Sequence, residues 1–185
     1  NAELERISHV DPLTGLANRR ALDRHAAALQ QQPARQSFLA VIIVDVDYFK
    51  TFNDYYGHAE GDRCLRAVAS AIRTACDNDD VACRFGGEEF LILRSEHSPR
   101  PRCALALAEN IRHTVASLAI PHQPTQEGKV TVSVGVCAGP FDPKTDLERL
   151  IKAADIALYE AKREGRNRVR YGSHATDSAV PPLPT

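Results

Sequence analysis

An uninterrupted apolar run over residues 38–44, rich in β-branched side chains, constrains the fold of this chain most strongly. A strand that is apolar on both of its sides is typical of a sheet interior, because both faces must then be covered. Strict alternation of valine with small or polar residues predicts a second strand over residues 129–137. Apolar residues spaced three and four apart predict helices, in stripes that begin at Ala21, Leu65, Ala104 and Leu147. Strands mixed with helices therefore predict an α/β or α+β sandwich.

Turn and cap residues set the expected boundaries of these elements. Asn18 and Asp62 each precede a helical stripe and are predicted to cap it. The pair Gly86-Gly87 separates two short apolar runs, 81–85 and 89–94, and predicts a hairpin with a two-residue turn. Because a hairpin pairs antiparallel strands, the sheet is expected to be partly antiparallel.

Composition excludes several classes of protein. Lys plus Arg number 23 and Asp plus Glu number 24, so the formal charge of −1 argues against a general nucleic-acid or membrane-surface binder. No apolar run approaches the roughly 18 residues of a membrane span. The cysteine count is odd, at five, and no two cysteines have the Cys-x-x-Cys spacing, which disfavours a disulfide framework or a zinc ribbon. Buried, reduced thiols in a cytoplasmic protein are the expected state.

We expect one domain over residues 11–171. Residues 1–10 have helical character, and the chain contains no Met, which indicates a fragment of a longer protein. These residues are predicted to end a linker helix arriving from an upstream sensory or receiver domain. That missing region could also anchor the full-length protein to a membrane, although the domain itself is expected to make no membrane contact. Residues 172–185 are rich in Ser and Pro and are predicted to be a disordered tail.

The first candidate site lies where the apolar strand ends, at Asp45-Val46-Asp47. Strand periodicity places Asp45 and Asp47 on one side, with the Val46 carbonyl between them. Such hard oxygen ligands suit Mg²⁺, which usually shares phosphate oxygens. Two solvated acids at an exposed strand end are an equally good interpretation of these residues alone.

The predicted hairpin carries the second candidate site. Glycines at its tip, Gly86 and Gly87, let the backbone approach a ligand closely. Glu88 and Glu89 follow, and a strand directs them to opposite faces, so that one of them would meet Asp45 across the sheet. By itself the cluster also fits an ordinary hairpin with a polar tip.

Two further clusters have both a functional and an ordinary interpretation. Asn53 and Asp62 carry side chains that pair with the polar edge of a base, or serve turns and helix caps, and His58 between them is more often structural. Lys162 and Arg166 lie four residues apart on one helix face, where they would clamp phosphate or form a solvated basic face. The chain has no phosphate-binding loop of the GxxxxGK[ST] type, so acids, glycines and scattered basic residues together favour metal-assisted phosphoryl chemistry.

In combination these motifs resemble the GGDEF family of diguanylate cyclases. The resemblance runs in order from about Asp11 to Tyr171. It is carried by five segments: 11–20 (DPLTGLANRR), 45–50 (DVDYFK), 53–62 (NDYYGHAEGD), the signature 86–90 (GGEEF), and 154–162 (ADIALYEAK) with 165–167 (GRN).

The resemblance implies an α/β (α+β) fold of the nucleotidyl-cyclase or palm-like kind, with a central mixed sheet surrounded by helices and a Gly-Gly hairpin. It implies a GTP-dependent nucleotidyltransferase that condenses two GTP molecules into cyclic di-GMP and releases two pyrophosphates. Each domain would hold one GTP, so a homodimer is required for catalysis. The implied cofactor is Mg²⁺, with Mn²⁺ as an alternative ion.

The resemblance also assigns roles to individual residues. Asp45, the Val46 carbonyl and Glu88 would bind the metal, supported by Glu89, and Glu88 would help deprotonate the attacking hydroxyl. Asn53 and Asp62 would recognise guanine, and Asp62 favours GTP over ATP. The residues expected around the substrate are His58, Phe49, Lys50, Gly86, Gly87, Lys162 and Arg166.

One departure and two alternatives complete the sequence-based expectations. Many members of the family carry Arg-x-x-Asp before the signature, where product binds and inhibits. Here Asp77 stands in place of the Arg, with Asp80 retained, so no tight product inhibition is expected through that turn.

The alternative functions are a catalytically silent module that binds GTP or cyclic di-GMP, and a palm-like nucleotidyltransferase acting on nucleic acid, which the neutral charge disfavours.

Overall fold

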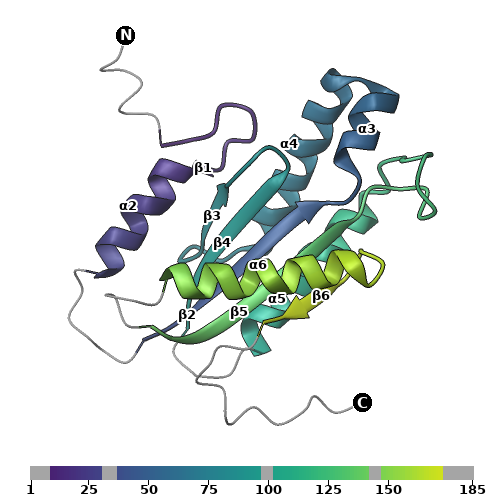
Figure 1. The fold of residues 1–185 in the computed structure, drawn as a ribbon. Helices are drawn as coiled ribbons and strands as arrows, with labels where there is room; N and C mark the ends of the chain where they lie inside the picture. The colour runs from purple at the N-terminus through teal and green to yellow at the C-terminus, as the bar shows by residue number, and fades with distance from the viewer. Residues whose placement is uncertain (1–8, 31–36, 97–101, 142–146, 173–185) are drawn as a thin grey trace.

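A computed structural model of the chain describes residues 9–30, 37–96, 102–141 and 147–172. They form a six-stranded mixed sheet with helices on both faces (Figure 1). The strands are β1 (Ala17–Asn18), β2 (Ser37–Val46), β3 (Val81–Arg84), β4 (Glu89–Glu96), β5 (Val132–Phe141) and β6 (Val169–Tyr171). The helices are α2 (Arg19–Gln30), α3 (Phe49–Tyr56), α4 (His58–Ala75), α5 (Arg102–Ser117) and α6 (Leu147–Arg163). The predicted fold class is confirmed.

The strand order is β1-β3-β4-β2-β5-β6, which puts β2 near the middle of the sheet. Strand β2 pairs antiparallel with both β4 and β5, whereas β1–β3 and β5–β6 are parallel pairs. The two outer pairs are short, so the long strands β4, β2 and β5 carry most of the sheet. Their ends define the region where the candidate residues meet.

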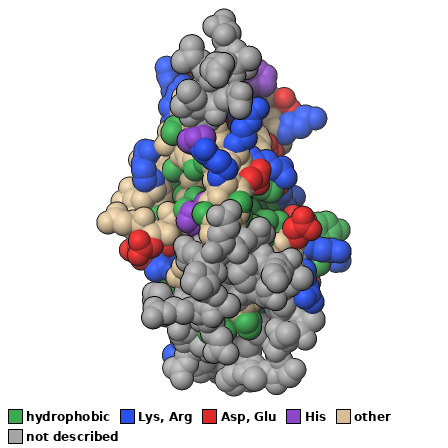
Figure 2. All heavy atoms as spheres, turned by 90° about the vertical axis from the view of Figure 1, so that its left-hand side faces the viewer, with side chains coloured by type: hydrophobic (Ala, Val, Ile, Leu, Met, Phe, Trp, Pro, Cys, Tyr) green, Lys and Arg blue, Asp and Glu red, His purple; other side chains and the backbone are tan. Residues whose placement is uncertain are grey.

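Helix α2 packs against β1 and β3 at one edge of the sheet (Figure 1). Asn18 caps α2 as expected, since its Oδ1 accepts a hydrogen bond of 3.0 Å from the backbone N–H of Ala21. Figure 2 shows the molecule from this side, where basic and acidic side chains are interspersed over the described surface. This distribution agrees with the balanced composition.

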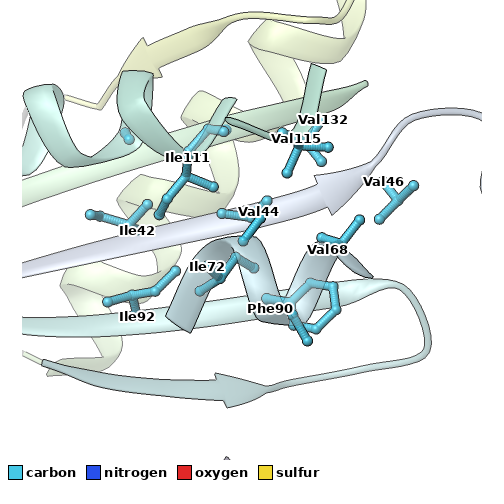
Figure 3. Close-up of a cluster of buried hydrophobic side chains, with 14 of the residues drawn as sticks. Ile42, Val44, Val46, Val68, Ile72, Phe90, Ile92, Ile111, Val115 and Val132 are labelled. Carbon is cyan, nitrogen blue, oxygen red and sulfur yellow. The ribbon is translucent and has the colours of Figure 1, made fainter. Parts of the chain in front are cut away.

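Strand β2 is apolar on both sides because it lies between two separate cores. Ala40, Ile42 and Val44 face the layer of α4 and α5, where they pack with residues such as Ile72 and Ile111 (Figure 3). The alternate residues of β2, Leu39, Val41 and Ile43, pack on the other face against Leu22 of α2 and Leu150, Ala154 and Leu158 of α6. Burial of both faces explains the uninterrupted run.

A close approach between α6 and β5 sets how near this helix lies to the sheet. A Cβ added to Gly135 would lie 2.0 Å from the carbonyl oxygen of Ala154 and 2.5 Å from the backbone nitrogen of Leu158. Only glycine therefore lets the helix lie this close to the sheet. The approach brings the last turn of α6, which carries Lys162, over the end of β2.

Three expected boundaries are wrong. Helix α4 begins at His58, after Gly57 with φ of 86°, so Asp62 lies within the helix and does not cap it. The expected strand over 129–137 is observed as Val132–Phe141. The hairpin connection spans residues 85–88, and the N–H groups of Phe85 and Gly86 both donate to the Glu89 carbonyl, so the turn is longer than two residues.

The remaining sequence expectations have mixed outcomes. All five cysteines are free thiols: Cys64, Cys83 and Cys137 are buried as expected, while Cys103 is exposed. No helix of the described ranges has the length and apolar character needed to cross a membrane. The predicted linker helix falls mostly on residues 1–8, and the predicted tail on residues 173–185, which lie outside the described residues.

Candidate active site

The register of the sheet brings the acidic residues together. Asp45, next to the end of β2, lies directly opposite Glu89 on β4 and opposite Ser133 on β5. The backbone N–H of Val46 donates to the Glu88 carbonyl at 3.3 Å, which holds the hairpin against the end of β2. Residues more than 40 positions apart in sequence therefore share one strand end, as the hairpin motif predicted.

Asp45 is a buried carboxylate with a basic partner. It is only 7% exposed, and its Oδ2 lies 2.8 Å from the Lys162 Nζ. Burial raises the pKa of Asp45 to about 6, because the attraction of Lys162 is opposed by desolvation and by repulsion from Glu88 and Glu89. The interpretation of Asp45 as a solvated strand-end acid is therefore wrong, and Lys162 is not part of a merely solvated basic face.

Asp47 points to the same face of the sheet but has different partners. It is 2% exposed, and its two oxygens accept hydrogen bonds of 2.7 Å from the hydroxyls of Thr131 and Ser133. The backbone N–H of Asn167 donates a third bond of 3.1 Å. Both oxygens of Asp47 are thus already occupied by protein donors, whereas Asp45 is paired through its Oδ2 with Lys162.

The glycines of the hairpin are not required by the fold. Neither Gly86 nor Gly87 has a positive φ angle. A Cβ on Gly87 would meet nothing within 4 Å, and one on Gly86 would come within 3 Å only of the flexible Glu89 carboxylate, at 2.9 Å. Absence of side chains here leaves open space beside the backbone, which is what a closely approaching ligand needs.

Arg84 connects the tip of the hairpin to Asp11, which lies before β1. Its Nε and Nη2 donate to the Gly87 carbonyl at 3.1 and 2.7 Å, and its Nη1 lies 3.4 Å from the Asp11 carboxylate. Asp11 in turn accepts bonds from the backbone N–H and the hydroxyl of Thr14. Asp11 and Thr14 stand in the 11–20 segment and Arg84 in the 81–85 run, but sequence reasoning gave these residues no role.

A second group of candidate residues lies at the corner between α3 and α4. The Oδ1 of Asn53 is buried without a hydrogen-bond partner among the described residues. A Cβ on Gly61 would lie 1.8 Å from this oxygen, so glycine is needed for α4 to pass so closely. Asp62 and His58 are exposed on α4. Among the described residues, the corner therefore presents one unsatisfied acceptor, on Asn53, and one exposed carboxylate, on Asp62.

The start of α3 presents backbone N–H groups. The first residues of a helix have N–H groups without intrahelical partners, which suits an anion. Lys50 is exposed there, but the Phe49 ring is 8% exposed and stacks on Phe52 at a centroid distance of 6.2 Å. The Phe49 side chain belongs to the core, so the predicted contact with the triphosphate is left to its backbone.

Arg166 lies in the loop between α6 and β6. Its guanidinium is 4.2 Å from the centroid of the Tyr48 ring, and its Nη1 donates to the Tyr48 hydroxyl at 3.1 Å. Next to Lys162, an open cleft of about 270 Å³ is lined by Glu89, Asp155, Ile156, Leu158, Tyr159 and Lys162. Sequence reasoning missed Asp155 and Tyr159, although both stand in the 154–162 motif.

The residues at the end of β2 fit a divalent cation. Within the described ranges no three His, Cys, Asp or Glu side chains are already arranged as a metal site. The carboxylates of Asp45, Glu88 and Glu89 contribute a formal charge of −3, and Lys162 contributes +1, so the cluster is left at −2. Burial is the main cause of the raised pKa of Asp45, and repulsion from Glu88 and Glu89 adds to it. Carboxylate and carbonyl oxygens are ligands that Mg²⁺ and Mn²⁺ accept.

A buried acid at a strand end, an open glycine turn and nearby basic groups are the kinds of group that metal-assisted phosphoryl chemistry uses. Comparison with known proteins then gives the family. The model for the GGDEF domain of diguanylate cyclases matches residues 8–168. The chain belongs to the GGDEF diguanylate cyclase family.

Individual relatives agree with this membership. Diguanylate cyclase A of Treponema denticola is 36% identical over 176 residues, covering 91% of this chain and 46% of the relative. Diguanylate cyclase DgcM of Escherichia coli K12 is 38% identical over 171 residues, covering 90% of this chain and 39% of the relative. The chain thus spans about half or less of the length of these curated relatives.

Solved structures match over nearly the whole chain. The coiled coil and GGDEF domain of DgcB from Caulobacter crescentus, solved with c-di-GMP, has a TM-score of 0.77 and 32% identity, covering 92% of this chain and 89% of that one. Diguanylate cyclase SiaD from Pseudomonas aeruginosa, solved with its activator SiaC, has a TM-score of 0.77 and 35% identity, covering 93% and 65%.

Proposed function

We propose that this domain is a diguanylate cyclase that condenses two GTP molecules into cyclic di-GMP and releases two pyrophosphates. The observation that carries the proposal is the buried Asp45, which lies beside the Glu88–Glu89 hairpin and pairs with Lys162. Family membership supports the same reaction. Because the relatives are about twice as long, the activity of the full-length protein is part of this proposal.

The metal-binding residues in this proposal are Asp45, Glu88 and the Val46 carbonyl, with Glu89 in support. A bound Mg²⁺, or Mn²⁺ in its place, would neutralise charge on the phosphate oxygens. Glu88 accepts the proton of the attacking 3′-hydroxyl. That oxygen forms a bond to the α-phosphorus of the other GTP, and the bond from this phosphorus to the bridging oxygen of pyrophosphate breaks. Repetition with the roles of the two GTP molecules exchanged closes the ring.

Substrate recognition is assigned to the α3–α4 corner and the basic residues. The Asp62 carboxylate accepts from the N1–H and the exocyclic N–H of guanine, donors that adenine does not present at these positions. Asn53 offers its unpartnered Oδ1 to the same base, and His58 lies nearby on α4. The triphosphate would lie against the α3 N-terminus at Phe49 and Lys50, the backbone of Gly86 and Gly87, and the side chains of Lys162 and Arg166.

Two copies of the domain must meet, because one site holds one GTP and the reaction joins two. The homodimer for catalysis is therefore part of the proposal, and regulation by an upstream sensory or receiver domain remains a prediction. A catalytically silent module is disfavoured, because every residue that the chemistry requires is present. A nucleic-acid-directed enzyme is disfavoured by the net charge of −1.

The test incubates the purified chain with GTP and Mg²⁺ and identifies products by mass spectrometry. Glu88→Gln is expected to reduce turnover at least about a hundredfold, since it removes both a metal ligand and the proton acceptor. Glu127→Gln, at an exposed loop position, is the matched control and is expected to retain turnover. Tight GTP binding without any cyclic di-GMP, in a chain dimerised artificially, would contradict the proposal and identify the silent module.

A further inference from the structure

Asp47 closes a junction between three parts of the chain that meet beside the candidate active site. Its side chain joins the end of β2 to the region before and within β5, through Thr131 and Ser133. The bond from the Asn167 N–H joins it to the loop between α6 and β6. Its own backbone N–H donates to the Thr131 carbonyl at 2.9 Å. Hydrogen bonds to a buried carboxylate are stronger than those between neutral groups, so this junction is firmly held.

The junction also holds an unusual backbone. Tyr48, Arg166 and Asn167 have φ angles of 55°, 63° and 47°, a region that side chains other than glycine rarely occupy. Within the described ranges, the one other non-glycine residue of this kind is Ala119. Such conformations persist when surrounding contacts determine them, and they cluster at functional sites. Tyr48 directly follows Asp47 in the chain, and the backbone N–H of Asn167 donates a hydrogen bond to the Asp47 side chain.

The strained loop carries a guanidinium to a defined place. Arg166 stacks on the Tyr48 ring, and its Nη1 contacts both the Tyr48 hydroxyl and, at 3.4 Å, the Lys162 carbonyl. Lys162 in turn pairs with Asp45. Asp47 therefore acts on two of the residues that hold Arg166: it precedes Tyr48 in the chain, and it accepts the bond from the backbone N–H of Asn167.

We infer that Asp47 is a positioning residue for the nucleotide triphosphate: with Thr131 and Ser133 it holds the α6–β6 loop so that Arg166 is presented to the phosphates. This inference rests on the proposed function, in which Arg166 contacts the triphosphate. The inference gives the two acids at the end of β2 different roles: Asp45 remains available to a ligand, and Asp47 holds the α6–β6 loop beside it.

Binding of a GTP analogue that cannot react tests this inference without requiring turnover. The probe is guanosine 5′-(α,β-methylene)triphosphate with Mg²⁺, titrated by calorimetry. Arg166→Ala is expected to weaken its binding about tenfold, the usual effect of losing one charge-assisted contact. Asp47→Ala is expected to weaken it by a similar factor. Guanosine alone, which has no phosphates, is expected to bind both variants and the unmodified chain equally well.

The double variant distinguishes a positioning role from a merely structural one. If Asp47 acts through Arg166, the double variant binds the analogue about tenfold more weakly than the unmodified chain, no worse than either single variant. A product of the two effects, about a hundredfold, would overturn the inference. Asp47→Asn, which keeps an acceptor for the Asn167 N–H, is expected to bind more tightly than Asp47→Ala.

Thr131→Val covers the case in which Asp47→Ala does not fold. It removes one hydroxyl donor to Asp47 with little change in shape, and its weakening of analogue binding is expected to vanish in the Arg166→Ala background. Thr74→Val, whose hydroxyl donates to the Ser70 carbonyl on the exposed side of α4, is the matched control and should bind normally. An unmodified chain that binds guanosine and the analogue equally would instead overturn the proposed function, and this inference with it.

Discussion

Replacing Asp45 by asparagine is expected to stabilise the metal-free chain while it abolishes turnover. Burial raises the pKa of this carboxyl to about 6 from an ordinary 3.8, despite the 2.8 Å contact with Lys162. The ionised side chain is therefore a net cost to the folded state at neutral pH. Asparagine keeps the shape of the protonated acid and removes that cost, along with the charge needed to bind a cation.

The magnitude follows from the two pKa values. Their difference corresponds to about 3 kcal/mol of free energy of unfolding at pH values above 6. The pKa of Asp45 is higher in the folded chain than in the unfolded chain. As pH rises from 3.8 to about 6, the unfolded chain therefore loses this proton while the folded chain keeps it, and the free energy of unfolding falls. Below pH 3.8 the side chain is protonated in both states, and the advantage of Asp45→Asn disappears.

Urea unfolding with a chelator present, followed by circular dichroism at pH 8 and pH 3.5, measures this difference. At pH 8 the variant should be more stable by up to about 3 kcal/mol, or about 6–12 °C in melting temperature for a domain of this size. Asp54→Asn, at an exposed position on α3, is the control and should change stability little at either pH. Equal stability of Asp45→Asn and the unmodified chain at pH 8, or a gain of the same size at pH 3.5, would refute the reasoning.

Four further substitutions test separate contacts. Gly135→Ala should lower the free energy of unfolding by about 3 kcal/mol, measured in urea, because its Cβ would lie 2.0 Å from a backbone carbonyl of α6. Gly61→Ala should weaken GTP binding at least about tenfold in calorimetry, since its Cβ would lie 1.8 Å from the Asn53 Oδ1 and displace that acceptor. Arg84→Ala should speed hydrogen exchange of residues 85–89 and lower turnover, because the carbonyl at the hairpin tip loses two donors. Asp77→Ala should leave the inhibition constant of cyclic di-GMP unchanged, because an acid at this turn does not hold the product.

Each of these expectations has a result that contradicts it. A Gly135→Ala variant of normal stability would mean that α6 shifts freely on the sheet. Unchanged GTP affinity in Gly61→Ala would remove the buried amide oxygen from base recognition. Unchanged hydrogen exchange of residues 85–89 in Arg84→Ala would show that the backbone hydrogen bonds to Glu89 are enough to hold the hairpin. Weaker product inhibition in Asp77→Ala would place a product contact at the turn.

The parts of the fold that sequence reasoning predicted are those determined by short-range patterns. The β2 run, the helical stripes and the hairpin signature each reflect neighbours within a few residues, so they were recognisable. The capping prediction for Asp62 was wrong for a local reason: Gly57 has a positive φ that lets the chain start α4 one turn earlier. The turn of the hairpin was predicted too short, because the Glu89 carbonyl accepts from two successive N–H groups.

The distinction between Asp45 and Asp47 could not be predicted from the sequence. Both acids face the same side of the sheet, as strand periodicity indicates. Their contacts differ because Asp47 meets donors 84, 86 and 120 positions further along the chain. Lys162 likewise reaches Asp45 only because Gly135 lets α6 lie against β5. Such contacts depend on how whole elements pack, so no local pattern contains them.

The most direct test of a reaction shared by two sites is to mix the unmodified chain with Glu88→Gln at constant total concentration and measure cyclic di-GMP formed from GTP and Mg²⁺. If two copies act together and associate at random, the rate falls as the square of the unmodified fraction. An equal mixture would then retain roughly a quarter of the rate. A linear fall, with roughly half of the rate retained, would show that a single site makes the product alone and would contradict the proposed mechanism.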